Sequence, residues 1–191
     1  MDHPRFDAVA AVSALASAAS AHAEHLPGAA KDVGSQIAAT QTVTQAPDAG
    51  CALPSEPWGI PAALDAAISG PADKDRACME ALLIPEARLI FASVGADGTP
   101  SYRLDTLDDW IARTKSRGHI IVEEKQLNFH LETEGGIAHV WSLYALRSDG
   151  KAVGRGINSI QAVKEAGGWR VASITVQAES ASAPFPEEYV L

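Results

Sequence analysis

The chain has 191 residues, of which 47% are hydrophobic and 20% are charged, and its formal net charge is −9. This composition predicts a folded domain, and the length allows one full core with residues to spare for a tail. The acidic balance, with no basic run interleaved with aromatic residues, argues against nucleic acid as a partner.

Residues 1–23 have the layout of a secretory signal peptide. Arg5 lies near the start, an alanine-rich apolar stretch follows, and Ala21-His22-Ala23 fits an A-x-A cleavage site. We therefore expect a periplasmic or secreted protein. A cytoplasmic tail is the alternative, because Asp2 and Asp7 depart from a basic start. The stretch is too short and too polar to predict a membrane span.

Residues 24–57 lack periodicity and are rich in Ala, Gln, Thr, Gly and Pro, which predicts a flexible linker before a folded domain over 58–191. The two cysteines leave two alternatives open. Cys51 and Cys78 form one disulfide if the protein is exported, or Cys78 is a buried free thiol, the commoner state among apolar neighbours. No Cys and His spacing indicates zinc and no phosphate-binding glycine loop is present, so we expect neither a metal nor a cofactor.

Three helices and one strand are expected between the linker and the last third of the chain. Asp73 is expected to cap the second helix, and Thr106, with Asp109 at the third helical position, the third. The expected helices are Pro61–Ser69, a segment from Asp73 to just before Pro85, and Leu107–Arg117, with the strand at Arg88–Val94.

The last third of the chain is divided by three glycine turns at 135–136, 149–150 and 167–168. Each lies between runs rich in β-branched and aromatic residues, a strong hairpin signal. The runs, 127–134, 137–147, 152–164 and 169–179, predict a four-stranded antiparallel meander, preceded by a short strand at 119–123. The fold class expected from this order is α+β.

Several segments resemble the nuclear transport factor 2-like (SnoaL-like) superfamily over residues 58–191. They are Ser69-Gly70-Pro71 with Asp75-Arg76, then Pro85–Leu89, Ile137–Tyr144, Arg155–Gln161 and Gly168–Val171. The resemblance implies a cone-shaped, curved antiparallel sheet packed with about three N-terminal helices, and a pocket. The superfamily includes isomerases, dehydratases, hydrolases and non-enzymatic binding modules, so the resemblance names no chemistry.

A ligand site is expected on one face of the meander. If every turn has two residues and no strand is bulged, one row across the sheet contains His130, Trp141, Asn158 and Gln177. A tryptophan flanked by three hydrogen-bonding groups suits a pocket for a small, mostly apolar molecule. The alternative is a solvated face, which antiparallel sheets commonly have.

Acid–base chemistry would need a carboxyl or imidazole group in a dry pocket. The candidates are His139 and Asp75, each with a structural alternative: a hydrogen-bonded histidine, and a surface ion pair with Arg76. The expected function is small-molecule binding. The alternatives are a cofactor-independent isomerase, dehydratase or hydrolase, and a non-catalytic interaction module.

A homodimer is expected as well, because three short helices cover only one face of so large a sheet. The C-terminal segment Ser180–Leu191 is the rival cover for the open face, through Phe185 and Tyr189–Leu191.

Overall fold

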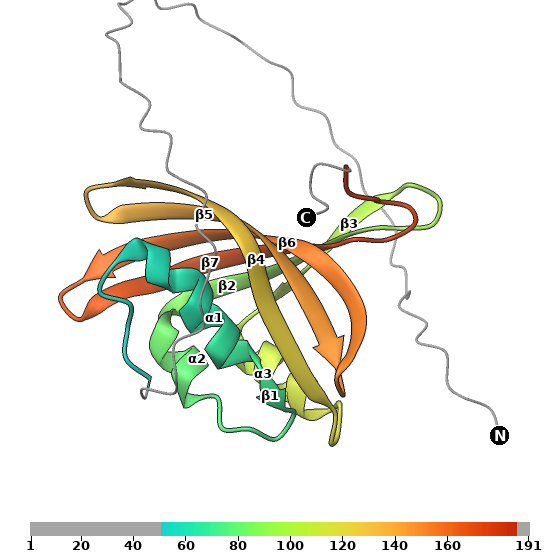
Figure 1. Ribbon diagram of the computed structural model, residues 1–191, viewed down its shortest axis with the longest axis horizontal. Helices are drawn as coiled ribbons and strands as arrows, with labels where there is room; N and C mark the ends of the chain where they lie inside the picture. The colour runs from blue at the N-terminus through green and yellow to red at the C-terminus, as the bar shows by residue number, and fades with distance from the viewer. Residues whose placement is uncertain (1–50, 187–191) are drawn as a thin grey trace, which may run out of the picture. The chain divides into compact units, whose positions relative to one another are not determined.

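The computed structural model describes residues 51–186 (Figure 1). The predicted signal peptide and nearly all of the predicted linker lie outside this range. None of the helices between residues 51 and 186 is long and apolar enough to cross a bilayer.

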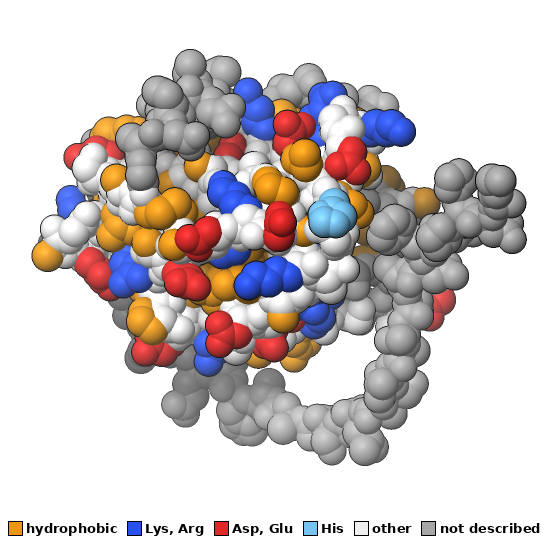
Figure 2. Space-filling view, turned by 90° about the horizontal axis from the view of Figure 1, so that it is seen from below, with side chains coloured by type: hydrophobic (Ala, Val, Ile, Leu, Met, Phe, Trp, Pro, Cys, Tyr) orange, Lys and Arg blue, Asp and Glu red, His pale blue; other side chains and the backbone are white. Residues whose placement is uncertain are grey.

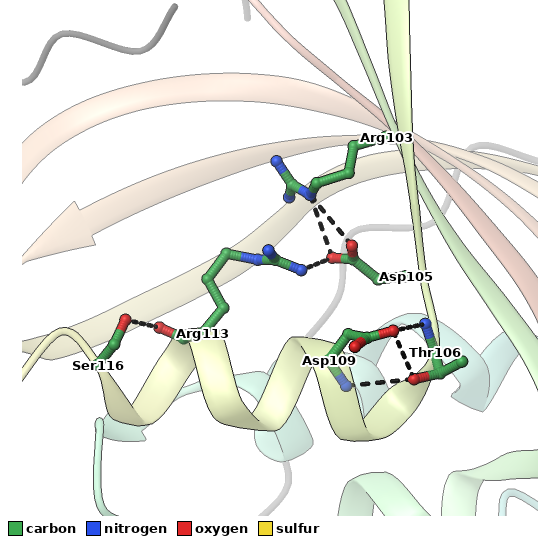
Figure 3. Close-up of polar contacts among 6 residues, drawn as sticks. All are labelled: Arg103, Asp105, Thr106, Asp109, Arg113 and Ser116. Carbon is green, nitrogen blue, oxygen red and sulfur yellow. Dashed lines mark hydrogen bonds and ion pairs between the residues drawn. The ribbon is translucent and has the colours of Figure 1, made fainter. Parts of the chain in front are cut away.

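The first turns of α1 and α3 are stabilised in different ways, by a proline with a fixed φ and by side chains that cap the free backbone N–H groups. A 3₁₀ turn, η1 (Pro57–Gly59), leads into α1 (Ile60–Ile68), which has a proline in its first turn. α3 (Leu107–Lys115) begins with the predicted capping box, in which Thr106 Oγ1 accepts from the Asp109 amide and the Asp109 carboxylate accepts from the Thr106 amide. Figure 3 shows this reciprocal pair.

The expected cap of the second helix is wrong. α2 spans only Ala77–Leu82, and the carboxylate that accepts a hydrogen bond at its start belongs to Asp75, whose Oδ1 lies 2.9 Å from the Ala77 nitrogen. Asp73 lies four residues before the helix begins. The second helix is therefore shorter at both ends than its apolar pattern predicted, because Leu83 already belongs to a strand.

Seven strands form one mixed sheet. They are β1 (Gly70–Pro71), β2 (Leu83–Val94), β3 (Pro100–Asp105), β4 (Ile121–Glu134), β5 (Ile137–Ser148), β6 (Lys151–Glu165) and β7 (Gly168–Ala178), in the order β1-β4-β5-β6-β7-β2-β3. The predicted meander is confirmed as β4–β7, in which each strand is antiparallel to the next.

The sheet is extended beyond the meander by strands that the sequence only partly revealed. β2 pairs parallel to β7, and β3 pairs antiparallel to β2. β2 begins five residues earlier than expected, and Pro85 lies where its pairing with β7 is interrupted, between Leu83 and Arg88. β3 alternates apolar and polar residues, but five of its six residues are exposed, including the apolar Tyr102 and Leu104.

The curved sheet wraps around the helices, which lie on its inner face (Figure 1). The core between the two layers is apolar, and its most deeply buried members are Ile60, Leu64, Met79, Val140, Ile160 and Val171. Trp169, expected in the core, is 2% exposed. The α+β class predicted from the order of elements is therefore confirmed.

Three strands of the meander contain one residue more than the partner strand opposite. The extra residues are Leu127 in β4, Val153 in β6 and Ala172 in β7. Each bulge reverses the side-chain alternation beyond it, because successive residues of a strand point to opposite faces. The expectation of an unbulged register is therefore wrong, and the two sheet faces have a different composition from the one predicted.

Cys51 and Cys78 form a disulfide, so the free-thiol alternative for Cys78 is wrong. The bond joins the start of the described chain to α2. The same segment hydrogen-bonds to the meander, where the Trp169 nitrogen lies 2.8 Å from the Pro54 oxygen. Gly168 permits this approach: its φ is +133°, and a Cβ there would lie 2.7 Å from that oxygen.

The outer face of the sheet exposes several apolar side chains, including Trp141 at 40% and Val153 at 56%. Part of the C-terminal segment lies along the sheet, where the Ser182 hydroxyl donates to the Val94 oxygen and the Phe185 nitrogen donates to Glu179. Tyr189–Leu191 lie outside the described residues. Dimerisation through the outer face stays a prediction.

Reducing the disulfide should destabilise the domain. The two cysteines are 27 residues apart. Opening a disulfide loop of this length lowers the free energy of unfolding by about 3 kcal/mol, because the unfolded chain gains conformational freedom. Urea unfolding with and without a reductant measures the difference. A double variant, Cys51→Ala with Cys78→Ala, is the control and should not respond to the reductant. An unchanged urea midpoint of the native chain on reduction would contradict the expectation.

Candidate ligand cavity

A cavity of about 240 Å³ lies between the inner face of the sheet and the helices. Its apolar wall is formed by side chains from α2, α3, β2 and β7, chiefly Met79, Leu89, Phe91, Trp110, Ile174 and Val176. The curvature of the sheet leaves this space because the helices cover only part of the concave face. Such a concave, mostly apolar site is typical of small-molecule binding.

Glu124 provides a carboxylate in the cavity wall. It lies on β4, where Ser69 fixes its backbone: the Ser69 hydroxyl donates to the backbone oxygen of Glu124 and accepts from its backbone nitrogen. Its Oε1 accepts two hydrogen bonds, from Gln126 Nε2 at 3.0 Å and from Asn158 Nδ2 at 3.1 Å. Two amides therefore hold one carboxylate oxygen in a fixed direction.

Gln126 connects this carboxylate to the rest of the core. Its side-chain oxygen accepts from the Ser142 hydroxyl on β5, and its backbone nitrogen donates to both oxygens of Asp65 on α1, at 3.1 and 3.0 Å. Gln126, Ser142 and Asn158 are each no more than 2% exposed. Buried polar groups are tolerated when they are hydrogen-bonded to one another in this way.

Burial raises the pKa of both carboxyl groups. For Glu124 the loss of solvent raises the pKa to about 7, the hydrogen bond from Asn158 opposes this, and the nearby charge of Asp65 adds to it. For Asp65 the loss of solvent raises the pKa to about 6, against the hydrogen bonds from Gln126. The carboxyl in the cavity wall can therefore exist in either protonation state near neutral pH.

Tyr144 closes the cavity beside Glu124. Burial and the charge of Glu124 raise the pKa of its phenol, which stays neutral. The ring lies against the backbone of Gly156 on the neighbouring strand: a Cβ at that position would lie 2.2 Å from the Tyr144 ring and hydroxyl. Any larger residue at Gly156 would push the ring out of place.

Arginine side chains gather at another part of the cavity wall, near α3. Arg103 and Arg117 both line the cavity, and the Arg103 guanidinium lies 4.5 Å from the centre of the Phe91 ring. Arg103 and Arg113 both donate to the buried carboxylate of Asp105, as Figure 3 shows. By contrast, a face of the molecule seen in Figure 2 mixes basic, acidic and hydrophobic side chains.

The predicted row of ligand-binding residues is divided between the two faces. His130 pairs with Trp141 as expected, but the row continues through Ser159 and Thr175 on the exposed outer face. Asn158 instead pairs with Ser142 and Val176 and lines the cavity. Gln177 also points outward, next to Ile157. The bulges at Val153 and Ala172 cause these shifts, together with the β6–β7 turn, which lies at Ala166-Gly167, one residue earlier than expected.

The predicted catalytic candidates also lie away from the cavity. His139 is on the outer face, with Nε2 3.2 Å from the Ser159 hydroxyl and Nδ1 3.9 Å from Glu132. Asp75 is exposed beside the start of α2 and makes no ion pair with Arg76. Arg76 instead is 4% exposed and donates to the backbone oxygens of Ala67, Ile68 and Pro71.

Sequence reasoning missed the polar residues that do meet in the cavity wall. Glu124 and Gln126 alternate with exposed residues at the start of β4, so in the sequence they look like the solvated side of a strand. Asp65 gave a signal that could have been used, because it is the one charged residue in the otherwise apolar helix α1. Within residues 51–186, no cluster of three or more His, Cys, Asp or Glu could hold a metal.

No protein-family model matches the chain, and no curated protein is significantly similar to it. Solved structures with a similar fold include a protein of unknown function with a cystatin-like fold from Nostoc punctiforme (TM-score 0.47, 12% identity, 65% of this chain and 89% of that one). Another is a nuclear transport factor 2-like protein from Silicibacter pomeroyi (TM-score 0.43, 14% identity, 64% of this chain and 92% of that one). A third is a nuclear transport factor 2-like protein from Cytophaga hutchinsonii (TM-score 0.41, 14% identity, 63% of this chain and 87% of that one). At these TM-scores and identities we infer neither a family nor an activity from the likeness.

The raised pKa of Glu124 makes stability depend on pH with a definite sign. The folded protein holds this proton more tightly than the unfolded chain, so the unfolding free energy should fall as pH rises from about 4.5 to about 7. Glu124→Gln keeps the acceptor oxygen and removes the charge. The variant should therefore gain about 2 kcal/mol relative to the native chain between pH 4 and pH 8.

Urea unfolding at both pH values measures this gain. Glu123→Gln, at the exposed neighbouring position on β4, is the matched control and should follow the native chain. Parallel pH profiles for the native chain and Glu124→Gln would show that Glu124 titrates as an ordinary carboxyl.

Proposed function

We propose that the domain binds a small, mostly apolar molecule in this cavity. The observation that carries the proposal is the cavity itself: about 240 Å³ of space with a mainly apolar wall and a few fixed polar groups. An apolar body is driven into such a space by the surface it removes from water, and placed polar groups set its orientation.

The Glu124 end of the cavity supplies those polar groups. Asn158 and Gln126 fix one oxygen of the carboxylate, and the structure gives the other no hydrogen bond from the described residues. A hydroxyl or carbonyl group of a ligand would find a carboxyl group there and the Tyr144 phenol beside it. A protonated Glu124 donates to a carbonyl, whereas an ionised one accepts from a hydroxyl.

A second candidate function is proton transfer by Glu124, as in an isomerase, dehydratase or hydrolase that needs no cofactor. It is favoured by the raised pKa of a carboxyl that faces an apolar cavity, since a general acid or base works best with a pKa near the working pH. Glu124→Gln separates the two candidates, because it removes the titrating proton and keeps the shape of the site.

We also propose that the protein is exported. The Cys51–Cys78 disulfide supports this, because disulfides persist mainly in oxidising compartments. Residues 1–23, with the layout of a signal peptide, supply the sequence argument. N-terminal sequencing of the protein from its native host should find a mature start near Glu24. A bulk product that retains Met1 would count against export.

Filling the mouth of the cavity should weaken ligand binding. Ala178 is an exposed residue that lines the cavity at the end of β7, so Ala178→Phe places a ring at its opening with little strain on the core. The probe is 2-naphthamide, a neutral bicyclic compound, and isothermal titration calorimetry measures its affinity. We expect Ala178→Phe to weaken binding by about tenfold or more.

The matched control is Gln177→Phe, one residue earlier on the outer face of the same strand. It adds the same ring and should leave the affinity unchanged. The proposed function fails if the native chain does not bind the probe, or if the two variants lose affinity equally. If only Gln177→Phe loses affinity, the outer face is the binding surface, as the sequence row predicted.

A further inference from the structure

Arg117 is a cavity-lining guanidinium without a counter-charge. It follows α3, and within residues 51–186 it has no ion pair or hydrogen bond from its side chain. Arg103 and Arg113, the nearby basic residues, share the one carboxylate of Asp105. Desolvation and the charges of Arg113 and Arg103 lower the pKa of Arg117. The local field is therefore positive, although the whole chain carries a net charge of −9.

A second guanidinium, which unlike that of Arg117 is buried, adds to this field. Arg76 lies 5.4 Å from the centre of the Trp110 ring, which itself lines the cavity. Its hydrogen bonds go to backbone oxygens, and no carboxylate among the described residues contacts it. Since backbone carbonyls carry no net charge, the charge of Arg76 is not cancelled, and Arg117 repels it.

The carboxylate of Glu124 does not neutralise these arginines either. An ion pair with a guanidinium would lower its pKa, whereas the pKa of Glu124 is raised. The cavity wall thus contains the carboxyl group of Glu124 and one uncompensated guanidinium, that of Arg117. The rings of Phe91 and Trp110 also line the cavity and offer an apolar body its contacts.

Thr114 supplies an independent sign of a missing partner near Arg117. It lies on α3, lines the cavity and is only 3% exposed, and its Oγ1 has no hydrogen-bond partner among the described residues. Buried hydroxyl groups are seldom left unpaired in native proteins. A ligand atom at this point of the wall would form a hydrogen bond with the Thr114 hydroxyl and would also approach Arg117.

We propose that the ligand is a small apolar monocarboxylate, whose carboxylate pairs with Arg117 at the α3 wall while its apolar body fills the cavity. The inference rests on the proposed function, since it names the class of molecule bound at the same site. An arginine fork matches the two oxygens of a carboxylate, and charge-assisted bonds of this kind are the strong ones. A single uncompensated guanidinium in the cavity wall fits a single negative charge.

The test compares two probes that differ in charge and little else. They are 2-naphthoate and its neutral amide, 2-naphthamide, titrated calorimetrically at about pH 7.5, where the acid is ionised. The native chain should bind the acid about tenfold more tightly than the amide. Arg117→Gln should bring the two affinities within about twofold of each other and leave that of the amide unchanged.

Two further variants control for net charge and for geometry. Arg88→Gln removes the same charge from an exposed side chain of β2 that bonds only to backbone oxygens, and it should keep the preference for the acid. Arg117→Lys keeps the charge without the fork and should keep part of the preference. Arg117 is exposed, so these substitutions leave the fold intact, which circular dichroism and thermal unfolding verify.

The failures can be told apart. If the native chain binds neither probe, the proposed function is wrong and the inference falls with it. If the amide binds as tightly as the acid, the cavity binds apolar molecules and the inference alone is wrong. A preference for the acid that survives Arg117→Gln, or that Arg88→Gln removes equally, also overturns the assignment to Arg117.

Discussion

The hydrogen bonds around Gln126 are the constraint that makes the inner face of this sheet usable as a site. Its backbone nitrogen holds Asp65 of α1, its side-chain nitrogen holds Glu124, and its oxygen accepts from Ser142 on β5. One residue thereby joins the helix layer to two strands. Because an unpaired polar group in such a core costs more than a paired one gains, the members must be kept together. The carboxyl of Glu124 therefore keeps one position in the cavity wall.

The three bulges decide which residues can take part. Leu127 adds one residue to β4 between the positions of Gln126 and Phe129, so both side chains face inward although they are three residues apart. Val153 does the same for β6 and turns Asn158 toward Ser142. Bulges also bend the strands that contain them. The same local irregularities thus accompany the curvature around the helices and bring the polar groups of the network to the concave side.

The cavity wall contains ionisable groups of both kinds, acidic and basic, among apolar side chains. Burial and the charge of Asp65 raise the pKa of Glu124 to about 7. Near α3, desolvation and the charges of Arg113 and Arg103 lower the pKa of Arg117, and Arg103 pairs with Asp105. In surroundings of low polarity each charge acts more strongly than it would in water. A molecule that enters the cavity meets a carboxyl group and a guanidinium in the same apolar wall. Orientation of a bound molecule, and not only its affinity, follows from that arrangement.

The sequence by itself determined the elements: the four strands of the meander from glycine turns and β-branched runs, α3 from its capping box, and the end of α1 from Gly70-Pro71. These signals are local, because turn and cap geometry depend on a few adjacent residues. Only the tertiary structure decided the faces. A single extra residue in a strand reverses every side chain beyond it, and no local pattern marked Val153 or Ala172 as that residue. Asn158 thus entered the cavity, Trp141 and Gln177 turned outward, and Glu124, which looked solvent-exposed in the sequence, became a carboxyl of the cavity wall.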